Sequence, residues 1–283
     1  MKQGGLAGSI VAVCATAATL APSLALAGTP GPTESLGKAK GIEYMRAKYL
    51  QVVTQTAQPV SCDGDAEVTG GGGSMAGPAT TSALNETYPV PESGWQAEGT
   101  STGDAKTLTG YAVCGPVDVD YETSQVPLSE NAVSHGSAIC PDPIGGGGGA
   151  TGPGMRLIGS SPRLPPSTAG WAPSMWTDTM DDTLFNMHAV CGPYDVKFRE
   201  ADTKLDAGGA GQALAKCRSD EVVLGGGFVG RKQDVVGFRT LALASKPWDS
   251  DDRKKVPDDG WRVRALNAET LSVKLRAIAT CRQ

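Results

Sequence analysis

The sequence has few of the residues that most active sites use. Histidine occurs twice in 283 residues, and no two cysteines are close enough in sequence to form a zinc-ligand pair. Its glycine runs are not followed by the lysine that a phosphate-binding loop requires. Lysine and arginine form no cluster that predicts nucleic-acid binding. We therefore expect a protein that is not an enzyme, with no cofactor, no metal site and no nucleic-acid partner.

Long hydrophobic runs are also missing, except near the amino terminus. Lys2 precedes an uncharged stretch from Leu6 to Leu26, which ends in the small-x-small sequence Ala25-Leu26-Ala27. This layout is typical of a secretory signal peptide. A membrane anchor is the competing interpretation, but the stretch is broken by Pro22 and no basic cluster follows it. We expect cleavage near Ala27, no membrane span in the mature chain, and secretion to the periplasm or the extracellular space.

Aromatic residues make up only 5% of the chain, whereas it contains 38 glycines and 19 prolines. Such a composition favours many short strands joined by tight turns over long helices. Six of the seven cysteines lie after the predicted cleavage site. An even number of cysteines in an exported protein predicts disulfide bonds.

Cysteine spacing reveals an internal repeat. Each of three segments reads, in order, cysteine, a glycine run, Ser/Thr-x-Pro, Gly-Trp, a terminal strand and a second cysteine. The cysteine pairs that bound these segments are Cys62 and Cys114, Cys140 and Cys191, and Cys217 and Cys281. The tryptophans, Trp95, Trp171 and Trp261, lie 19, 20 and 20 residues before the second cysteine. This agreement indicates a structural repeat.

The repeat predicts an all-β fold of three pseudo-repeats, each with about five short strands and one disulfide. We expect a β-prism or a barrel-like assembly, with three sheets in a row as the alternative. Residues 28–40 are expected to be a flexible lead before units at 41–116, 117–193 and 194–283. The third unit carries an acidic insertion at 248–260. Its carboxylates could bind calcium, but the basic residues within it favour a solvated loop.

The terminal strands show strict alternation, which predicts their core faces. Leu271, Val273 and Leu275 share a face with Cys281, and the repeated tryptophans are expected to anchor the core from the preceding strand. At the start of the first unit, Ile42 to Val53 has helical spacing. Comparison with the other units instead predicts a strand over Tyr49 to Thr56.

Two disulfide schemes respect the repeat. Either each unit closes on itself (62–114, 140–191, 217–281) or the units link head to tail (114–140, 191–217, 281–62). The second scheme requires a closed ring of units, whereas the first works for any number of units. We therefore favour pairing within each unit.

Two tryptophans fall outside the repeat pattern and are the candidate ligand-stacking residues. Trp176 is out of phase with the core-facing positions of its strand, and Trp248 lies at the start of the acidic insertion. Exposed aromatic rings can stack on sugars or anchor a protein partner. The alternative is that each packs in a small local core. His188 occupies the position of Tyr111 and Ile278 in the other units, which indicates a packing or surface position.

The pattern Cys…VTGGG…Pro…Gly-Trp…Leu-x-Gly-Tyr-Ala-Val-Cys resembles a repeat of exported bacterial proteins of unknown function. The resemblance covers residues 41–283 and implies a secreted β-rich module without established catalytic residues. Our hypothesis is a secreted, non-enzymatic protein of unknown ligand, acting in surface interaction or adhesion. Its partner would be a polysaccharide or a cell-surface protein. The alternatives are a lectin-like carbohydrate-binding module and a secreted hydrolase using serine, histidine and aspartate.

Overall fold

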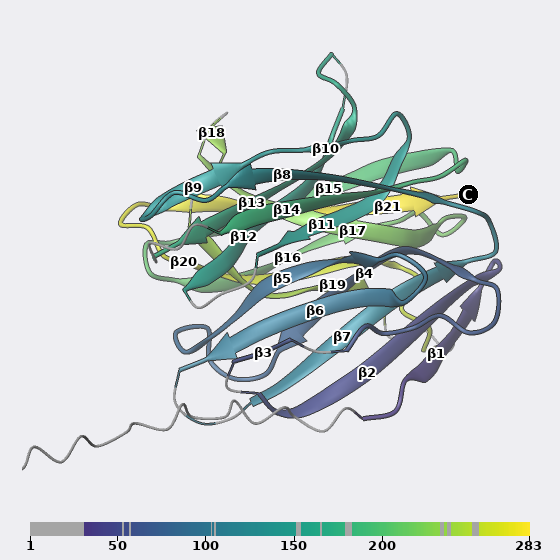
Figure 1. The fold of residues 1–283 in the computed structure, drawn as a ribbon, viewed down its shortest axis with the longest axis horizontal. Coiled ribbons are helices and arrows are strands. Elements are labelled where there is room, and N and C mark those ends of the chain that lie inside the picture. Colours follow the sequence, from purple (N-terminus) through teal and green to yellow (C-terminus); the bar gives the residue numbers. More distant parts are fainter. Residues whose placement is uncertain are drawn as a thin grey trace, which may run out of the picture.

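The computed structural model describes residues 31–283, apart from 53, 57, 103, 105, 151–153, 165, 179–182, 233–234, 237–238 and 251–254 (Figure 1). The predicted signal peptide, residues 1–27, lies outside the described residues. The described chain is all-β, with antiparallel strands arranged in three sheets. Among the described residues, no helix could span a membrane.

Sheet A has seven strands in the order β1-β2-β7-β4-β19-β20-β16. Their bounds are β1 (Glu34–Ala39), β2 (Ile42–Val52), β7 (Lys106–Gly115), β4 (Glu67–Met75), β19 (Thr240–Trp248), β20 (Gly260–Asn267) and β16 (Ala210–Lys216). The expected alternation is clear in β20, where Trp261, Val263 and Ala265 are buried and Arg262 and Arg264 are not. At β20, one face of sheet A therefore packs in the core and the other is turned outward.

Sheet B has six strands in the order β3-β6-β5-β11-β14-β8, and sheet C has eight. The strands of sheet B are β3 (Thr54–Thr56), β6 (Gly94–Ser101), β5 (Ser82–Val90), β11 (Pro143–Gly149), β14 (Leu184–Cys191) and β8 (Asp120–Pro127). Sheet C runs in the order β10 (Ala138–Ile139), β13 (Gly170–Thr177), β12 (Met155–Arg163), β17 (Val222–Lys232), β21 (Val273–Arg282) and β15 (Val196–Leu205). In addition, β9 (Ala132–His135) pairs with β13, and β18 (Val235–Val236) pairs with β17.

Each sheet combines strands from two of the predicted units. Sheet A joins β2, β7 and β4 of residues 41–116 to β19, β20 and β16 of residues 194–283. Sheet B joins β8, β14 and β11 to β5, β6 and β3, and sheet C joins β15, β21 and β17 to β12, β13 and β10. The joining pairs are β4–β19, β11–β5 and β12–β17. Each unit therefore contributes strands to two sheets, and each sheet contains strands of two units.

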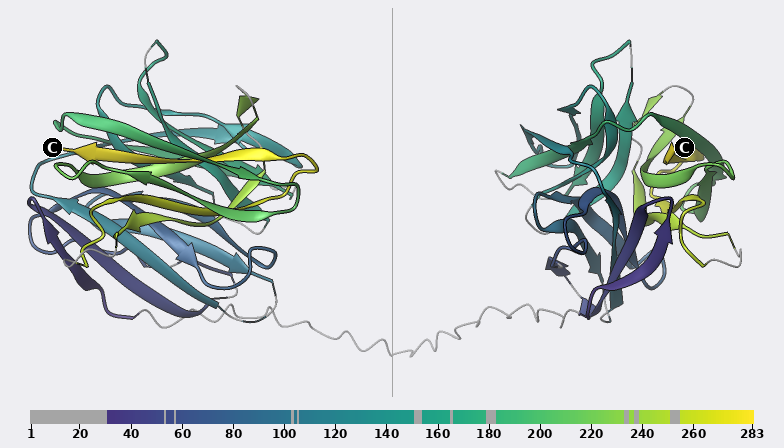
Figure 2. Two further views of the ribbon diagram at one scale, coloured as in Figure 1. Left: turned by 180° about the vertical axis from the view of Figure 1, so that it is seen from behind. Right: turned by 90° about the vertical axis from the view of Figure 1, so that its right-hand side faces the viewer.

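The three sheets surround a shared interior, seen roughly along the strands in Figure 2, right. The main hydrophobic cluster contains Tyr44 of sheet A, Ile144 of sheet B and Leu224 of sheet C. A smaller cluster, with Trp171 and Phe185, packs between sheets B and C. No sheet closes into a barrel among the described strands.

The first glycines of the three runs meet in this interior. β4, β11 and β17 each belong to a different sheet and carry Gly70, Gly145 and Gly225. A Cβ added to Gly225 would lie 3.0 Å from the carbonyl oxygen of Ile144, and 3.5 and 3.6 Å from the Cα atoms of Gly70 and Gly145. Added Cβ atoms on Gly70 and Gly145 would also meet backbone, at Leu224 and Thr69 respectively. At Gly70 and Gly145 the neighbouring backbone lies too close for any other residue.

Two expectations about the start of the chain need correction. The predicted flexible lead, 28–40, is wrong over Glu34–Ala39, which forms β1 at the edge of sheet A. Lys40 and Gly41 have φ angles of 46° and 81°, which fit a two-residue hairpin turn between β1 and β2. The expected strand over Tyr49 to Thr56 is correct in type, but β2 already starts at Ile42.

The units also contain more strands than the five expected. Their opening segments change sheets: β2 lies in sheet A and β3 in sheet B, β8 in B with β9 and β10 in C, and β15 in C with β16 in A. Leu271, expected on the core face, is 56% exposed because it precedes β21. A strand pattern read from sequence does not show where a chain leaves one sheet for another.

The disulfides join Cys62 to Cys114, Cys140 to Cys191 and Cys217 to Cys281. This is the favoured scheme, in which each unit closes on itself. Each bond ties the segment before a glycine-rich strand to that unit's terminal strand. A loop of this size stabilises the fold by roughly 4 kcal/mol in the chain-entropy account.

Candidate functional site

The three repeated tryptophans make equivalent contacts, each in the core of its own unit. Trp95, Trp171 and Trp261 are no more than 1% exposed. Each indole N–H donates a hydrogen bond to the hydroxyl of its unit's Ser/Thr-x-Pro motif, which is Thr87, Ser160 or Ser245. A Cβ on the second glycine of each run, Gly71, Gly146 or Gly226, would overlap the ring. The glycine run, the hydroxyl and the tryptophan therefore form one packing unit.

The residue after each of these hydroxyls lies on the outward face of its sheet, because successive side chains in a strand alternate. In sheet A this residue is Lys246, whose ammonium donates to the Tyr111 hydroxyl at 2.9 Å and lies 4.8 Å from the ring centroid. In sheet B it is Tyr88, which stacks on His188 at 4.7 Å between centroids. The same frame therefore carries different side-chain chemistry in different sheets.

A hollow of about 400 Å³ opens around Lys246. It lies between the β1–β2 hairpin and the segment joining β19 to β20, which are side by side in Figure 2, right. Its charged and aromatic lining comprises Arg46, Lys246, Lys255, Arg262, Tyr111, Trp248 and Asp249. Four cations and two aromatic rings against one acidic residue make this hollow the candidate binding site.

The cations in the hollow differ in their partners. Nε of Arg46 donates to a Glu34 carboxylate oxygen at 2.8 Å. Nε of Arg262 is buried without a hydrogen-bond partner in the described structure. Lys246 and Arg262 lie directly opposite each other on β19 and β20. Two positive charges in these positions repel each other, and the repulsion destabilises the strand pair unless an anion lies between them.

The structure places the two candidate stacking tryptophans at opposite ends of β19. Trp248 ends the strand, is half-buried in the hollow, and has the Lys216 ammonium 5.3 Å from its ring centroid. Trp176 is a half-buried residue of β13, in sheet C, and has the Arg239 guanidinium 5.6 Å from its ring centroid. Arg239 immediately precedes β19. The two rings therefore do not form one platform.

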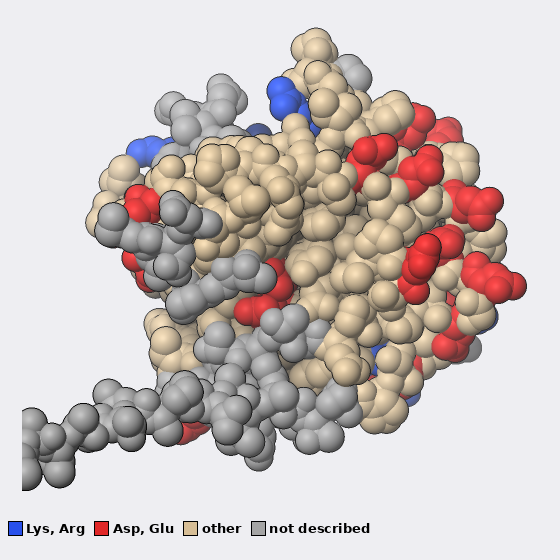
Figure 3. All heavy atoms as spheres, viewed as in Figure 1, with Lys and Arg blue, Asp and Glu red and all other residues tan. Residues whose placement is uncertain are grey.

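Acidic groups gather on one side of the molecule. Figure 3 shows them on the right of the view, near the C-terminal end of β21. A hollow of about 410 Å³ includes Asp65, Glu67, Glu92 and Asp118 in its lining. The chain carries a formal net charge of −5, so the cations of sheet A form a local exception.

The outward face of sheet B carries a group of titratable residues. Glu86 on β5 lies directly opposite Glu98 on β6 and is 4% exposed. Burial, followed by the charge of Glu98 and a hydrogen bond to it, raises the pKa of Glu86 to about 9. Burial lowers the pKa of the nearby His188 to about 4 and is the main cause that raises the pKa of Tyr88. At neutral pH Glu86 is therefore protonated and His188 is neutral.

Two serines bear on the hydrolase alternative. His135 Nδ1 lies 2.8 Å from Ser174 Oγ, and burial lowers the pKa of His135. Among the described contacts, no carboxylate orients this imidazole. The sequence Gly99–Gly103 also has Gly-x-Ser-x-Gly spacing, but Ser101 is 4% exposed, ends strand β6 and donates to the Asp104 carbonyl. It does not sit on the exposed strand-to-helix turn of a hydrolase nucleophile.

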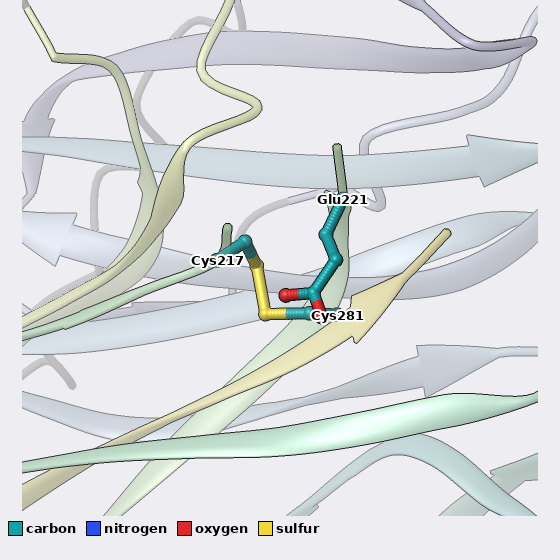
Figure 4. Close-up of side chains that lie close together, drawn as sticks. All are labelled: Cys217, Glu221 and Cys281. Atoms are coloured by element: carbon teal, nitrogen blue, oxygen red, sulfur yellow. A yellow bond between two sulfur atoms is a disulfide. The ribbon is translucent and has the colours of Figure 1, made fainter. Parts of the chain in front are cut away.

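One cluster resembles a metal-ligand set in composition. Cys217, Glu221 and Cys281 lie close together, as Figure 4 shows. The two sulfurs are bonded to each other, so neither is a free thiolate ligand. Glu221 accepts hydrogen bonds from Arg199 and from the backbone N–H of Arg218, with Arg199 as the main cause of its lowered pKa. The cluster is explained by structural contacts.

Sequence reasoning missed most of the hollow. Trp248 was a candidate from sequence, but Arg46 of β2 is far along the chain from Lys246 of β19 and Arg262 of β20. The available signal was the position after each Ser/Thr of the Ser/Thr-x-Pro motif, where the third unit has a lysine. This lysine could be recognised as part of a site only once β19 was known to lie beside β4, and thus near Tyr111 of β7.

Comparisons with known proteins give no further guide. No protein-family model matches the chain, and no significantly similar curated protein was found.

Proposed function

We propose that the chain is a secreted, non-enzymatic protein that binds polysaccharide at a cell or matrix surface. The observation that carries this proposal is the hollow on sheet A, where the half-buried Trp248 lies among polar and charged groups. Aromatic rings with a polar edge suit sugar recognition, because the ring packs on the apolar face of the sugar while nearby donors bond its oxygens. The three disulfides fit an exported protein.

The proposal includes the architecture. We infer a β-prism of three pseudo-repeats, in which each unit gives half of its strands to a sheet shared with the next. The equivalent joining pairs β4–β19, β11–β5 and β12–β17 support it, as does the meeting of Gly70, Gly145 and Gly225. Such a rigid arrangement of strands would hold outward side chains in fixed positions. Fixed side chains favour binding because little conformational freedom is lost when the ligand binds.

A binding panel tests the function. The oxidised, full-length mature protein would be passed over immobilised neutral and anionic polysaccharides, with retention measured against a heat-unfolded sample. We expect the folded protein to be retained on at least one polysaccharide and released by the soluble form of the same polymer. Absence of specific retention across the panel would contradict a polysaccharide-binding role.

A secreted hydrolase is the second candidate, because His135 and Ser174 are in contact. A serine-directed fluorophosphonate probe distinguishes the two. The non-enzymatic proposal predicts no labelling of the folded protein beyond that of Ser174→Ala. Labelling that is lost in Ser174→Ala would support the hydrolase.

A further inference from the structure

We propose that the hollow on sheet A recognises the anionic groups of an acidic polysaccharide, its carboxylates or sulfates. This inference rests on the proposed polysaccharide-binding function and narrows its ligand class. It follows from a comparison of equivalent positions in the three sheets, because the same arrangement of strands occurs in each.

Register identifies the equivalent positions. Arg46 is opposite Tyr111, and Lys246 is opposite Arg262. The corresponding opposite pairs are Thr123 with His188 and Tyr88 with Gln96 in sheet B, and Glu200 with Ile278 and Ser161 with Ala172 in sheet C. Sheets B and C thus have the same arrangement of strands without a lysine or arginine at these positions. The fold does not require the three cations of sheet A.

Of the described residues that line the hollow, one is acidic, Asp249. Lys246 and Arg262 face each other across neighbouring strands, and the buried Nε of Arg262 has no partner in the described structure. Within the described residues, the ion pair in this group is that of Arg46 with the half-exposed Glu34. A buried donor without an acceptor costs about 1–3 kcal/mol. An anionic group in the hollow would accept from Arg262 and relieve the repulsion between Arg262 and Lys246.

The aromatic residue Trp248 specifies a saccharide better than a simple ion. Tyr111 is 6% exposed and holds the Lys246 ammonium above its ring, whereas Trp248 is half-buried in the wall at the end of β19 and can offer a ring face to a sugar. At about 400 Å³, the hollow is large enough for sugar rings and not only for a single inorganic ion. A polymer that presents an anion beside an apolar ring face matches both features. General attraction of polyanions is not expected from a chain with a net charge of −5.

The test uses polymers that differ in charge. Titration calorimetry would compare dextran with dextran sulfate, which share a backbone, and would add polygalacturonate as the carboxylate form. The site variant is Lys246→Gln with Arg262→Gln, which leaves side chains of the kind found at Gln96. The control is Lys197→Gln with Lys274→Gln, which removes the same charge from sheet C. Circular dichroism would verify that both variants fold.

The wild-type protein should bind dextran sulfate or polygalacturonate saturably, and more weakly as salt concentration rises. The site variant should bind at least about tenfold more weakly, while the control retains wild-type affinity. Equal loss in the two variants, or no loss in either, would overturn the assignment to this hollow. Binding of neutral dextran alone would overturn the anionic specificity but leave the proposed function standing. Binding of no polymer here or in the panel would overturn both.

Discussion

At the residue scale, the glycine runs act through close packing. Gly70, Gly145 and Gly225 meet at a point where three backbones converge, and the next glycine of each run lies against a core tryptophan. A phosphate-binding loop would instead direct its backbone N–H groups outward to a ligand. In β4, β11 and β17 these groups belong to strand pairing. The runs are thus required by packing.

A substitution pair tests this account of the glycines. Gly70→Ala should lower the free energy of unfolding by about 1–3 kcal/mol, because its methyl group would overlap the backbone at Leu224 and Gly225. Gly159→Ala is the matched control, since its methyl group would make ordinary contacts of 3.4 Å or more. Denaturant unfolding gives both values. Equal effects of the two substitutions would argue against the convergence of backbones at Gly70.

The pKa of Glu86 predicts a pH dependence. A carboxyl whose folded-state pKa is raised from 4.5 to about 9 binds a proton that the unfolded state releases above pH 4.5. The stability it contributes is complete below pH 4.5 and is lost as pH rises toward about 9. Glu86→Gln keeps the shape of the protonated acid, so it should be more stable than wild type at pH 9.

Urea unfolding at pH 5, 7 and 9 measures this effect. The advantage of Glu86→Gln should grow from pH 5 to pH 9 by more than about 1.4 kcal/mol, the free energy that corresponds to one pKa unit. Glu130→Gln, at an exposed position, serves as the control. If the free energies of unfolding of wild type and Glu86→Gln change in parallel with pH, the titration of Glu86 does not cause the pH dependence of stability.

At the element scale, periodicity predicted some strands and missed others. Strand β20 alternates from Trp261 to Leu266, and β21 alternates from Val273 to Arg276, so these core faces were readable from sequence. From Ala277 to Cys281 both faces of β21 are buried. β1 has the sequence ESLGKA, which offers no alternation, and it forms because a tight turn returns the chain along β2. The joins between units, such as β4 with β19, depend on residues about 170 positions apart and leave no local pattern.

The third disulfide offers an element-scale prediction. Replacing Cys217 and Cys281 together by serine should lower the free energy of unfolding by about 2–5 kcal/mol, because the bond closes a long loop onto β21. Guanidinium unfolding of the variant and of the oxidised parent provides the measurement. A loss below about 0.5 kcal/mol would mean that β15 and β17 already fix β21 without the bond.

The same region allows a test of the metal interpretation. Since the sulfurs of Cys217 and Cys281 are bonded and Glu221 is paired with Arg199, chelator should not change the melting temperature of the oxidised protein. Differential scanning calorimetry with and without EDTA measures this. A lower melting temperature in EDTA, restored by added zinc, would show that the cluster holds a metal.

At the scale of the whole molecule, the repeat predicted three related segments but not how they combine. Cysteine and tryptophan spacing gave the order of motifs within each segment, which says nothing of the exchange of strands between them. The hollow follows from that exchange, because Arg46 and Tyr111 come from one segment and Lys246, Trp248 and Arg262 from another. A candidate ligand class could therefore be argued only from the assembled fold.

The central claim is that a polysaccharide binds beside Trp248. Tryptophan fluorescence tests it directly in a titration with dextran sulfate or polygalacturonate, on the wild type and on Trp248→Phe. We predict a saturable change in emission for the wild type with at least one of these polymers, and no such change for Trp248→Phe, whose other four tryptophans remain. An equal change in both proteins, or none in the wild type with either polymer, would contradict the claim.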